Sequence, residues 1–230
     1  MEIGWPREAG DLDAIQVEIA RSVAAVPAWR RPAGRPIAIA GLFVASSTSG
    51  TDRCWAATAV VRAGRTDSTA VAAAEADAPY VPGRLALREG RLLERAVLAL
   101  AEPIDVLLVN ATGRDHPRGA GLALHLGAVL DLPTIGVTDR ALAAEAAGEP
   151  GADRGSSVPL LLAGDVVGHV VRTRRRAKPV VVHAGWRTDP DTARTVVLDV
   201  CGRARTPEPI RAARRAARLA RAVGEGRLSP

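Results

Sequence analysis

Aromatic side chains and cysteines are scarce in this chain of 230 residues, which contains four Trp, one Tyr, one Phe and two Cys. With aromatics at 3%, the core must be built from Ala, Val, Leu and Ile, whose smaller side chains depend on close packing. Cys54 and Cys201 have neither metal-ligand spacing nor the number needed for a disulfide framework. We expect both to be buried, reduced thiols in a reducing compartment.

Long apolar runs are also missing. No segment approaches the roughly 18 uninterrupted apolar residues of a membrane span, and residues 1–10 contain no apolar run behind a basic start. The sequence therefore predicts a cytoplasmic protein with no membrane partner. Its length suits one sizeable α/β domain. We expect a monomer with a helix and Pro-rich linker over 1–36 and a core over 37–223.

Lysine is nearly absent, because Lys178 is the only lysine among 31 basic residues. The net charge is +6, and from Arg172 to Arg221 there are 14 basic residues against 4 acidic ones. Arginine binds phosphate through a planar, bidentate group, so this basic end suits nucleic acid or another polyanion. GC-rich coding and a solvated helix face are the alternative explanations of the same excess.

The hydrophobic pattern predicts a mixed α/β order of elements. A helix at 11–25 precedes three strands at 37–44, 55–62 and 69–76, joined by short connections. Strands and helices then alternate: we expect helices at 83–100, 121–130, 191–200 and 209–223, and strands at 104–109, 134–137, 166–172 and 180–183. A three-strand antiparallel meander followed by parallel βα units, flanked by helices, is the order of the ribonuclease H-like mixed sheet.

Two loops have the composition of functional segments. In the segment 78–83, two prolines stiffen the backbone and present Tyr80 and Val81 outward. Such an apolar wedge can enter a base stack, although a Pro-rich helix cap has the same composition. The segment 110–119 follows the most apolar strand, at the end where open α/β sheets carry functional loops. Its acidic, imidazole and guanidinium groups favour a site there as much as a structural turn.

Taken together, these segments resemble the endonuclease V family, in order and along nearly the whole chain. The family's wedge is similar to residues 79–83, its His-Pro-Arg turn to 116–118, its Pro-Thr-Ile-Gly-Val strand to 133–137, and the start of its last helix to 207–211. The resemblance implies nucleic-acid contacts from Pro79, Tyr80, Val81, Pro82, Gly83, Arg88, Arg118 and Gly136.

Members of this family cleave DNA or RNA near a deaminated base, usually inosine, with Mg²⁺ held by acidic residues. The resemblance implies that Glu89 and His116 retain catalytic positions, with Glu89 as the remaining metal ligand. Three catalytic positions are substituted. Phe43 and Asn110 stand where the family has acids at the first strand and after Val109, and Asp139 stands where it has a lysine.

These substitutions bear directly on the metal, because Mg²⁺ prefers hard oxygen ligands and is usually held by one or two carboxylates. Phe43 offers no oxygen and puts an apolar ring where a dication is expected, and Asn110 offers only a neutral oxygen. Metal assistance contributes several kcal/mol to catalysis. We therefore expect conventional cleavage to be lost or strongly impaired.

Three functions follow, in order of preference. The first is a nucleic-acid-binding protein for deaminated DNA or RNA that keeps the wedge without the cleavage. The second is an active nuclease with a rebuilt site, in which Glu89, Asp115, His116 and Asp139 converge. The third is a non-catalytic interaction subunit, whose basic helix at 209–223 binds an acidic partner.

Overall fold

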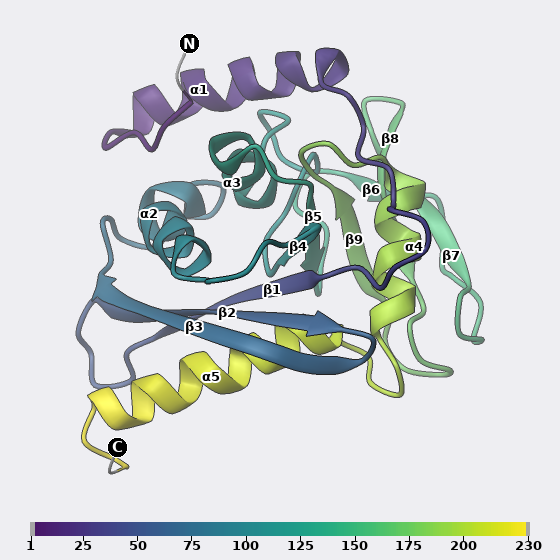
Figure 1. Cartoon of the computed structure of the whole chain (residues 1–230). Helices are drawn as coiled ribbons and strands as arrows, with labels where there is room; N and C mark the ends of the chain where they lie inside the picture. Colours follow the sequence, from purple (N-terminus) through teal and green to yellow (C-terminus); the bar gives the residue numbers. More distant parts are fainter. Residues whose placement is uncertain (1–2, 229–230) are drawn as a thin grey trace.

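A nine-stranded mixed sheet runs through the centre of the computed structural model, which describes residues 3–228 (Figure 1). The strands lie in the order β3-β2-β1-β4-β5-β9-β8-β7-β6. Their bounds are β1 Ile39–Ser46, β2 Arg53–Arg62, β3 Arg65–Glu75, β4 Val106–Val109, β5 Thr134–Thr138, β6 Glu145–Ala146, β7 Ser157–Leu162, β8 Asp165–Val171 and β9 Val180–Ala184.

The pairing confirms the predicted ribonuclease H-like sheet. Strand β2 pairs antiparallel with both β1 and β3, which gives the meander. Strand β4 then pairs parallel to β1, and β5 pairs parallel to β4. Consequently the carboxyl ends of β1, β4 and β5 lie side by side at one edge of the sheet, where connecting loops usually carry function.

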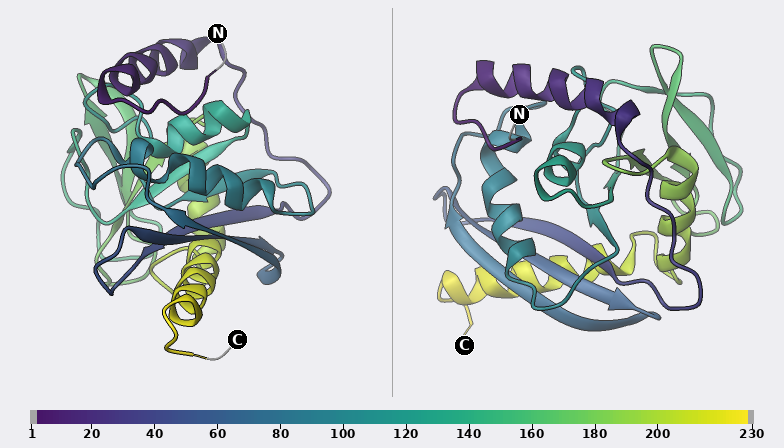
Figure 2. Two further views of the ribbon diagram at one scale, coloured as in Figure 1. Left: turned by 90° about the vertical axis from the view of Figure 1, so that its left-hand side faces the viewer. Right: turned by 45° about the horizontal axis from the view of Figure 1, so that its top comes forward.

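Helices cover both faces of the sheet (Figures 1 and 2). On one face lie α2 (Leu85–Leu98) and α3 (Leu122–Leu130), with α1 (Ala9–Ser22) outside them. A short 3₁₀ turn, Val23–Ala25, continues α1. On the other face lie α4 (Pro190–Val200) and α5 (Glu208–Gly224). All four main predicted helices of the core and the N-terminal helix are therefore confirmed, with shifts of a few residues at their ends.

Alternation along β1 divides the core between these two helical layers. Ala38, Ala40 and Leu42 pack in the cluster that includes α2, whereas Ile37 and Ile39 pack with residues of α4. At Gly41 a Cβ atom would lie 2.1 Å from the backbone of Pro209, so a glycine lets α5 approach β1 closely. Successive residues of a strand point to opposite faces, and this register decides which helix each side chain of β1 meets.

The structure contains one hairpin arm that the sequence pattern did not predict. Strand β7 pairs antiparallel with β8, and the two-residue strand β6 pairs with β7 at the sheet edge. The predicted pairing of β8 with β9 is confirmed as antiparallel. Cys54 and Cys201 are buried free thiols, as expected. Within the described part of the chain, no helix has the length and apolar character needed to cross a membrane.

Candidate functional site

The wedge is a rigid projection ahead of α2. Residues 81–84 form a tight turn in which the N–H of Arg84 donates to the carbonyl of Val81 at 3.0 Å. Gly83 has φ +75°, the left-handed value that the third residue of a type II turn requires after proline. The turn presents Tyr80, which is 69% exposed, and Val81, which is 43% exposed. Large apolar side chains held outward in this way suit insertion between bases.

The His-Pro-Arg turn holds the wedge in place from below. The carbonyl of Gly83 accepts hydrogen bonds from His116 Nε2 at 3.0 Å and from Arg118 Nη2 at 2.7 Å. The N–H of Arg118 donates to His116 Nδ1 at 3.3 Å, which fixes a neutral imidazole with its proton on Nε2. Burial lowers the pKa of His116, which also favours this neutral form. His116 therefore acts here as a brace, with both of its nitrogens occupied.

The two arginines predicted to contact nucleic acid are also engaged with the protein. Arg118 donates from Nε to Gln16 at 2.7 Å and lies 3.3 Å from Asp13 of α1. Arg88 donates to the carbonyl of Ala78, at the other end of the wedge, at 2.8 Å. Both guanidinium groups thus fix the wedge loop, and Gln16 is a supporting residue that the sequence pattern did not single out.

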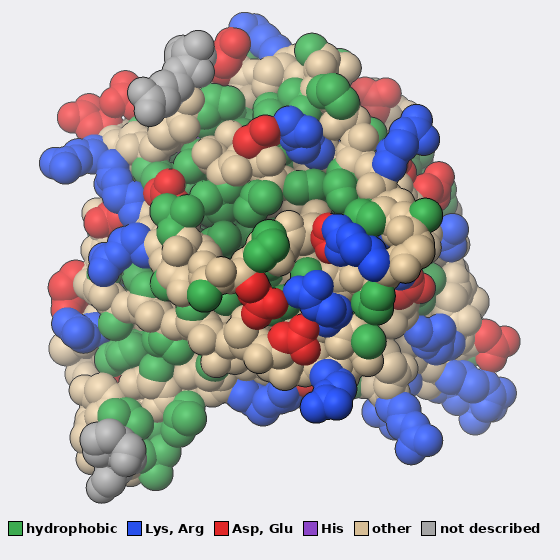
Figure 3. Space-filling view, viewed as in Figure 1, with side chains coloured by type: hydrophobic (Ala, Val, Ile, Leu, Met, Phe, Trp, Pro, Cys, Tyr) green, Lys and Arg blue, Asp and Glu red, His purple; other side chains and the backbone are tan. Residues whose placement is uncertain are grey.

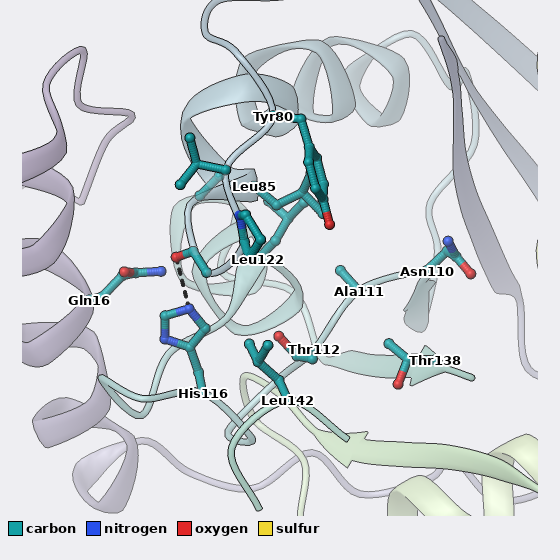
Figure 4. A pocket seen from close by; sticks show the side chains of 14 residues that line it. Gln16, Tyr80, Leu85, Asn110, Ala111, Thr112, His116, Leu122, Thr138 and Leu142 are labelled. Carbon is teal, nitrogen blue, oxygen red and sulfur yellow. Dashed lines mark hydrogen bonds between the residues drawn. The ribbon is translucent and has the colours of Figure 1, made fainter. Parts of the chain in front are cut away.

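A pocket of about 190 Å³, here called the wedge pocket, opens beneath Tyr80 and Gly83 (Figure 4). Its walls combine the wedge, His116 and the turn that contains Asn110 and Thr112. A cavity of about 150 Å³ already accommodates a benzene ring, so the wedge pocket has the scale of one planar ring system. Apolar walls with a few polar groups are typical of a small-ligand pocket.

A second cavity of about 140 Å³, the Glu89 cavity, adjoins the wedge and brings together Glu89, Asn110 and Phe43. Its other lining residues are apolar side chains and Tyr80. Glu89 comes from the second turn of α2 and has no hydrogen bond or ion pair within residues 3–228. Burial raises the pKa of Glu89 to about 7, although nearby Arg88 opposes this effect. The Glu89 carboxylate therefore faces this cavity without a hydrogen-bond or ion-pair partner among the described residues.

Phe43 does not point its ring at Glu89. The ring packs against alanines of β1, β2 and α5, on the opposite face from α2, and the guanidinium of Arg214 lies 4.9 Å from the ring centroid. The sequence predicted that this ring would occupy the position of a dication. Instead, the backbone alternation of β1 turns the ring toward α5, where a fixed cation covers it.

The donor set of this edge is poor in anionic oxygen for a magnesium ion. Among the residues that line the Glu89 cavity, Glu89 is the only carboxylate, and Asn110 supplies a neutral amide oxygen. The part of the chain from 3 to 228 contains no group of three or more His, Cys, Asp or Glu side chains arranged to hold a metal. Mg²⁺ is usually held by one or two carboxylates together with waters and substrate phosphates, and this cavity supplies the smaller of these numbers, with no second acid at position 43 or 110.

The residues of the predicted rebuilt site do not converge. Asp115 is fully buried, and its carboxylate accepts the N–H groups of residues 142, 143 and 144 at 2.7 to 2.8 Å. Asp139 instead lies 2.7 Å from Arg205 in an ion pair. With His116 bonded to Gly83, Glu89 is the one member of the predicted set that remains free of protein partners among the described residues. Asp115 and Asp139, which the second hypothesis placed in a rebuilt site, instead bind loop N–H groups and Arg205.

Gly136, predicted to contact nucleic acid, is buried in β5. A Cβ atom at this position would lie 2.3 Å from the carbonyl oxygen of Ala111 and 3.0 Å from the N of Gly113. A glycine is therefore needed for the turn after β4 to pack on β5. Its contribution to any ligand is indirect, through the position of the turn that carries Asn110.

Comparison with known proteins identifies the family of this chain. The family model of Endonuclease V matches residues 18–215. The Endonuclease V of Rhodospirillum centenum is 45% identical over 149 residues, and the match spans only 62% of that relative. The Endonuclease V of Streptomyces avermitilis is 38% identical over 213 residues, which are 91% of each chain. Its crystal structure has a TM-score of 0.85 and 35% identity, and covers 98% of this chain and 97% of that one.

The Endonuclease V of Ciona intestinalis, solved in complex with a 24mer DNA containing an inosine followed by a ribo-adenosine, has a TM-score of 0.77 over 92% of this chain and 96% of that one. At 20% identity this likeness shows the fold alone. The match of the family model, the Streptomyces relative along nine tenths of both chains, and the shared fold lead to one conclusion: the chain belongs to the Endonuclease V family.

Proposed function

We propose that this protein binds DNA or RNA that contains a deaminated base such as inosine, without conventional Mg²⁺-dependent cleavage of the strand. The observation that carries the proposal is the contrast between two neighbouring cavities. The wedge above the wedge pocket is held by hydrogen bonds from His116 and Arg118. The Glu89 cavity, by contrast, has a single carboxylate, and Arg214 lies over the Phe43 ring next to it. Recognition and cleavage are thus separable in this chain.

Recognition rests on the wedge and the pocket beneath it. A single base stacked on Tyr80 and placed in the wedge pocket would meet apolar walls and polar groups at Asn110, Thr112 and His116. Moving a base out of its stack requires a few kcal/mol, and less for a mismatched or unpaired base. A rigid aromatic side chain offsets part of this energy, because stacking on one base contributes about 1–3 kcal/mol. An inosine-containing strand, the ligand of the Ciona relative, fits this chemistry.

Loss of cleavage rests on the charge of the neighbouring cavity. Attack on a phosphodiester needs stabilisation of the extra negative charge that develops in the transition state, which a divalent cation supplies in a metal-dependent nuclease. Neither Phe43 nor Asn110 provides the anionic oxygen that would hold such a cation. Each missing 1.4 kcal/mol slows the reaction about tenfold, so the loss of several kcal/mol reduces the rate by orders of magnitude.

Binding and cleavage are tested in parallel on the full chain. Fluorescence anisotropy in EDTA compares short single and double strands that contain inosine with matched strands that contain adenosine, in both DNA and RNA. A second assay incubates the same inosine strands with Mg²⁺ and follows nicking on a denaturing gel. We expect salt-dependent binding that prefers inosine, and no nicking above background. Tyr80→Ala is the variant expected to lose the preference.

Two results would overturn the proposal. Nicking of the inosine strand in Mg²⁺ at an ordinary enzymatic rate, abolished by Glu89→Gln, would show that the cleavage site is functional. Equal binding of inosine and adenosine strands by the wild-type protein, or no binding at low salt, would remove the recognition function.

A further inference from the structure

Helix α5 carries five arginines, and Lys and Arg side chains project along the lower border of the molecule in Figure 3, where α5 lies in the same view in Figure 1. Arg221 donates to the carbonyl of Ser46 at 3.1 Å, and the other four form two groups with different partners. Arg211 and Arg215 form ion pairs with Glu208 at 2.6 and 2.7 Å. Arg214 and Arg218 form no hydrogen bond or ion pair with any described residue. Both instead lie over the ring of Phe43, with their guanidinium carbons 4.9 and 6.0 Å from its centroid. The unpaired arginines are therefore gathered on one side of α5, above the end of β1.

Arg214 is the more unusual of the two because it is half-buried without an anion. Its Nε atom is inaccessible to solvent and has no hydrogen-bond partner. Burial lowers the pKa of Arg214, and the positive charges of Arg218 and Arg205 lower it further, against the attraction of Asp139. Buried charges in folded proteins are normally paired, and a cation–π contact contributes only about 0.5–2 kcal/mol. An anion bound to Arg214 would compensate for its lost solvation and for its repulsion by the neighbouring arginines.

The position of the Arg214 guanidinium indicates which anion it binds. Residue 43 lies on β1 at the level where β4 ends, Asn110 follows β4, and Asp139 follows β5, so these three residues lie along one edge of the parallel strands. Arg214 covers the first of them and feels the charge of the last. Residue 43 also lines the Glu89 cavity, so Arg214, which lies over the Phe43 ring on the α5 side, is one residue away from that cavity. The wedge pocket and the Glu89 cavity share Tyr80, Asn110 and two leucines, so a strand whose base entered the wedge pocket would bring its backbone close to this edge of the sheet.

We propose that Arg214, supported by Arg218, binds one phosphodiester group of the nucleic-acid backbone at the edge of the Glu89 cavity. The guanidinium donates two parallel N–H···O bonds to the phosphate oxygens. The fixed cation thereby supplies positive charge at an edge where no divalent ion is held, and binding requires no metal. The inference rests on the proposed function and assigns a role to residues that the family resemblance did not select.

The site is tested with Arg214→Ala and a matched control, Arg215→Ala, which removes the neighbouring arginine that faces Glu208. Anisotropy titrations in EDTA with an inosine strand are repeated over a series of salt concentrations. We expect Arg214→Ala to weaken binding about tenfold or more, as the loss of one charge-assisted contact does, and to reduce the salt slope by about 0.7 for a single strand. Arg215→Ala should change affinity less than about twofold.

A second measurement locates the phosphate. Strands that carry one neutral methylphosphonate linkage, at successive positions around the inosine, are titrated against the wild type and Arg214→Ala. A neutral linkage at one position should weaken binding by the wild type about tenfold. It should leave the affinity of Arg214→Ala unchanged, because that variant has already lost the contact. Arg214→Lys keeps the charge without the planar guanidinium group, so its affinity should lie between those of the wild type and Arg214→Ala. Melting curves establish that each variant is folded.

The outcomes separate the two proposals. If the wild type binds inosine strands and Arg214→Ala behaves like Arg215→Ala, the phosphate site is wrong and the proposed function stands. The same follows if every neutral linkage weakens the wild type and Arg214→Ala equally. If the wild type binds no strand, both proposals fail together.

Discussion

Replacing Glu89 by glutamine is expected to stabilise the protein, and to do so increasingly as the pH rises. The pKa of Glu89 is about 7 in the folded protein, against 4.5 for the unperturbed group. Between these values the unfolded chain releases its proton while the folded chain keeps it, so wild-type stability falls as the pH rises through this window. Below it both states are protonated, and above it the full penalty of the buried charge applies.

The size of this penalty follows from the same two values. The difference between about 7 and 4.5 corresponds to an upper limit of about 3 kcal/mol in the free energy of unfolding. Because the Glu89 carboxylate opens onto the Glu89 cavity, solvent screening reduces the expected effect to about 1–2 kcal/mol. Glu89→Gln should therefore show no pH-dependent gain near pH 4 and a gain of this size above pH 7.

Urea denaturation of the wild type and Glu89→Gln at pH 4, 6 and 8 measures the effect, with equal m-values as the test that only stability has changed. Glu225→Gln is a control of opposite sign. Hydrogen bonds from residues 47 and 48 lower the pKa of Glu225 to about 2, so its carboxylate stabilises the fold above pH 4.5 and that contribution is lost toward pH 2. The glutamine variant should accordingly be destabilised at neutral pH.

Magnesium provides the decisive arm of the same experiment. A ligand that binds only the folded state stabilises it by mass action, so an ion held by Glu89 would stabilise the wild type more than Glu89→Gln. We expect Mg²⁺ to leave the difference between the two proteins unchanged. A difference that is independent of pH, or a selective stabilisation of the wild type by Mg²⁺, would refute the description of Glu89 as an unpartnered carboxylate in a site that does not fit the metal.

Three further substitutions test other parts of the site. Tyr80→Ala should weaken binding to an inosine strand about tenfold in anisotropy titrations. The melting temperature should stay unchanged, which distinguishes this effect from a folding defect. Leu219 is another exposed apolar residue, and Leu219→Ala should change neither the affinity nor the melting temperature. Asp115→Asn should lower the urea-derived stability by about 2–4 kcal/mol, because three backbone N–H groups lose their anionic acceptor, and a loss under 1 kcal/mol would contradict this role. Asp139→Lys should increase the salt slope of binding by about 0.7 without nicking in Mg²⁺, since the ion pair with Arg205 is removed; an unchanged slope would place residue 139 away from the strand.

The sheet could be predicted from sequence because its strands carry strong local signals. Val106–Val109 is a continuous apolar run, as a strand buried on both faces requires. Strand β7, which has only the two-residue β6 outside it, was missed because Pro159 interrupts its pattern and its residues are only partly buried. Pattern alone distinguishes a central strand well and an edge strand poorly.

The site was less predictable, because side-chain direction and pairing are tertiary properties. The sequence identified Arg88 and Arg118 as candidates for nucleic-acid contact, but whether an arginine is free depends on which carbonyls lie near it in space. The wedge could be predicted, since proline and glycine fix its backbone locally. Conversely, Arg214 looked like one of several arginines on a solvated helix. Only the register of β1 against α5 places it over Phe43 and makes it distinct from Arg215.

The residues at positions 43, 139 and 214 form a consistent arrangement of charge at this edge of the sheet. An acid at position 43 would project toward Arg214, form an ion pair with it, and leave neither group free for a metal or a phosphate. With Phe43 there, the guanidinium has an apolar support and keeps its charge. Asp139 forms an ion pair with Arg205 and also attracts Arg214. This attraction offsets part of the repulsion between the arginines, and the edge keeps a net positive charge. Restoring an acid at position 43 alone would therefore pair it with Arg214, the cation that already lies over this side chain, and would neutralise the fixed charge.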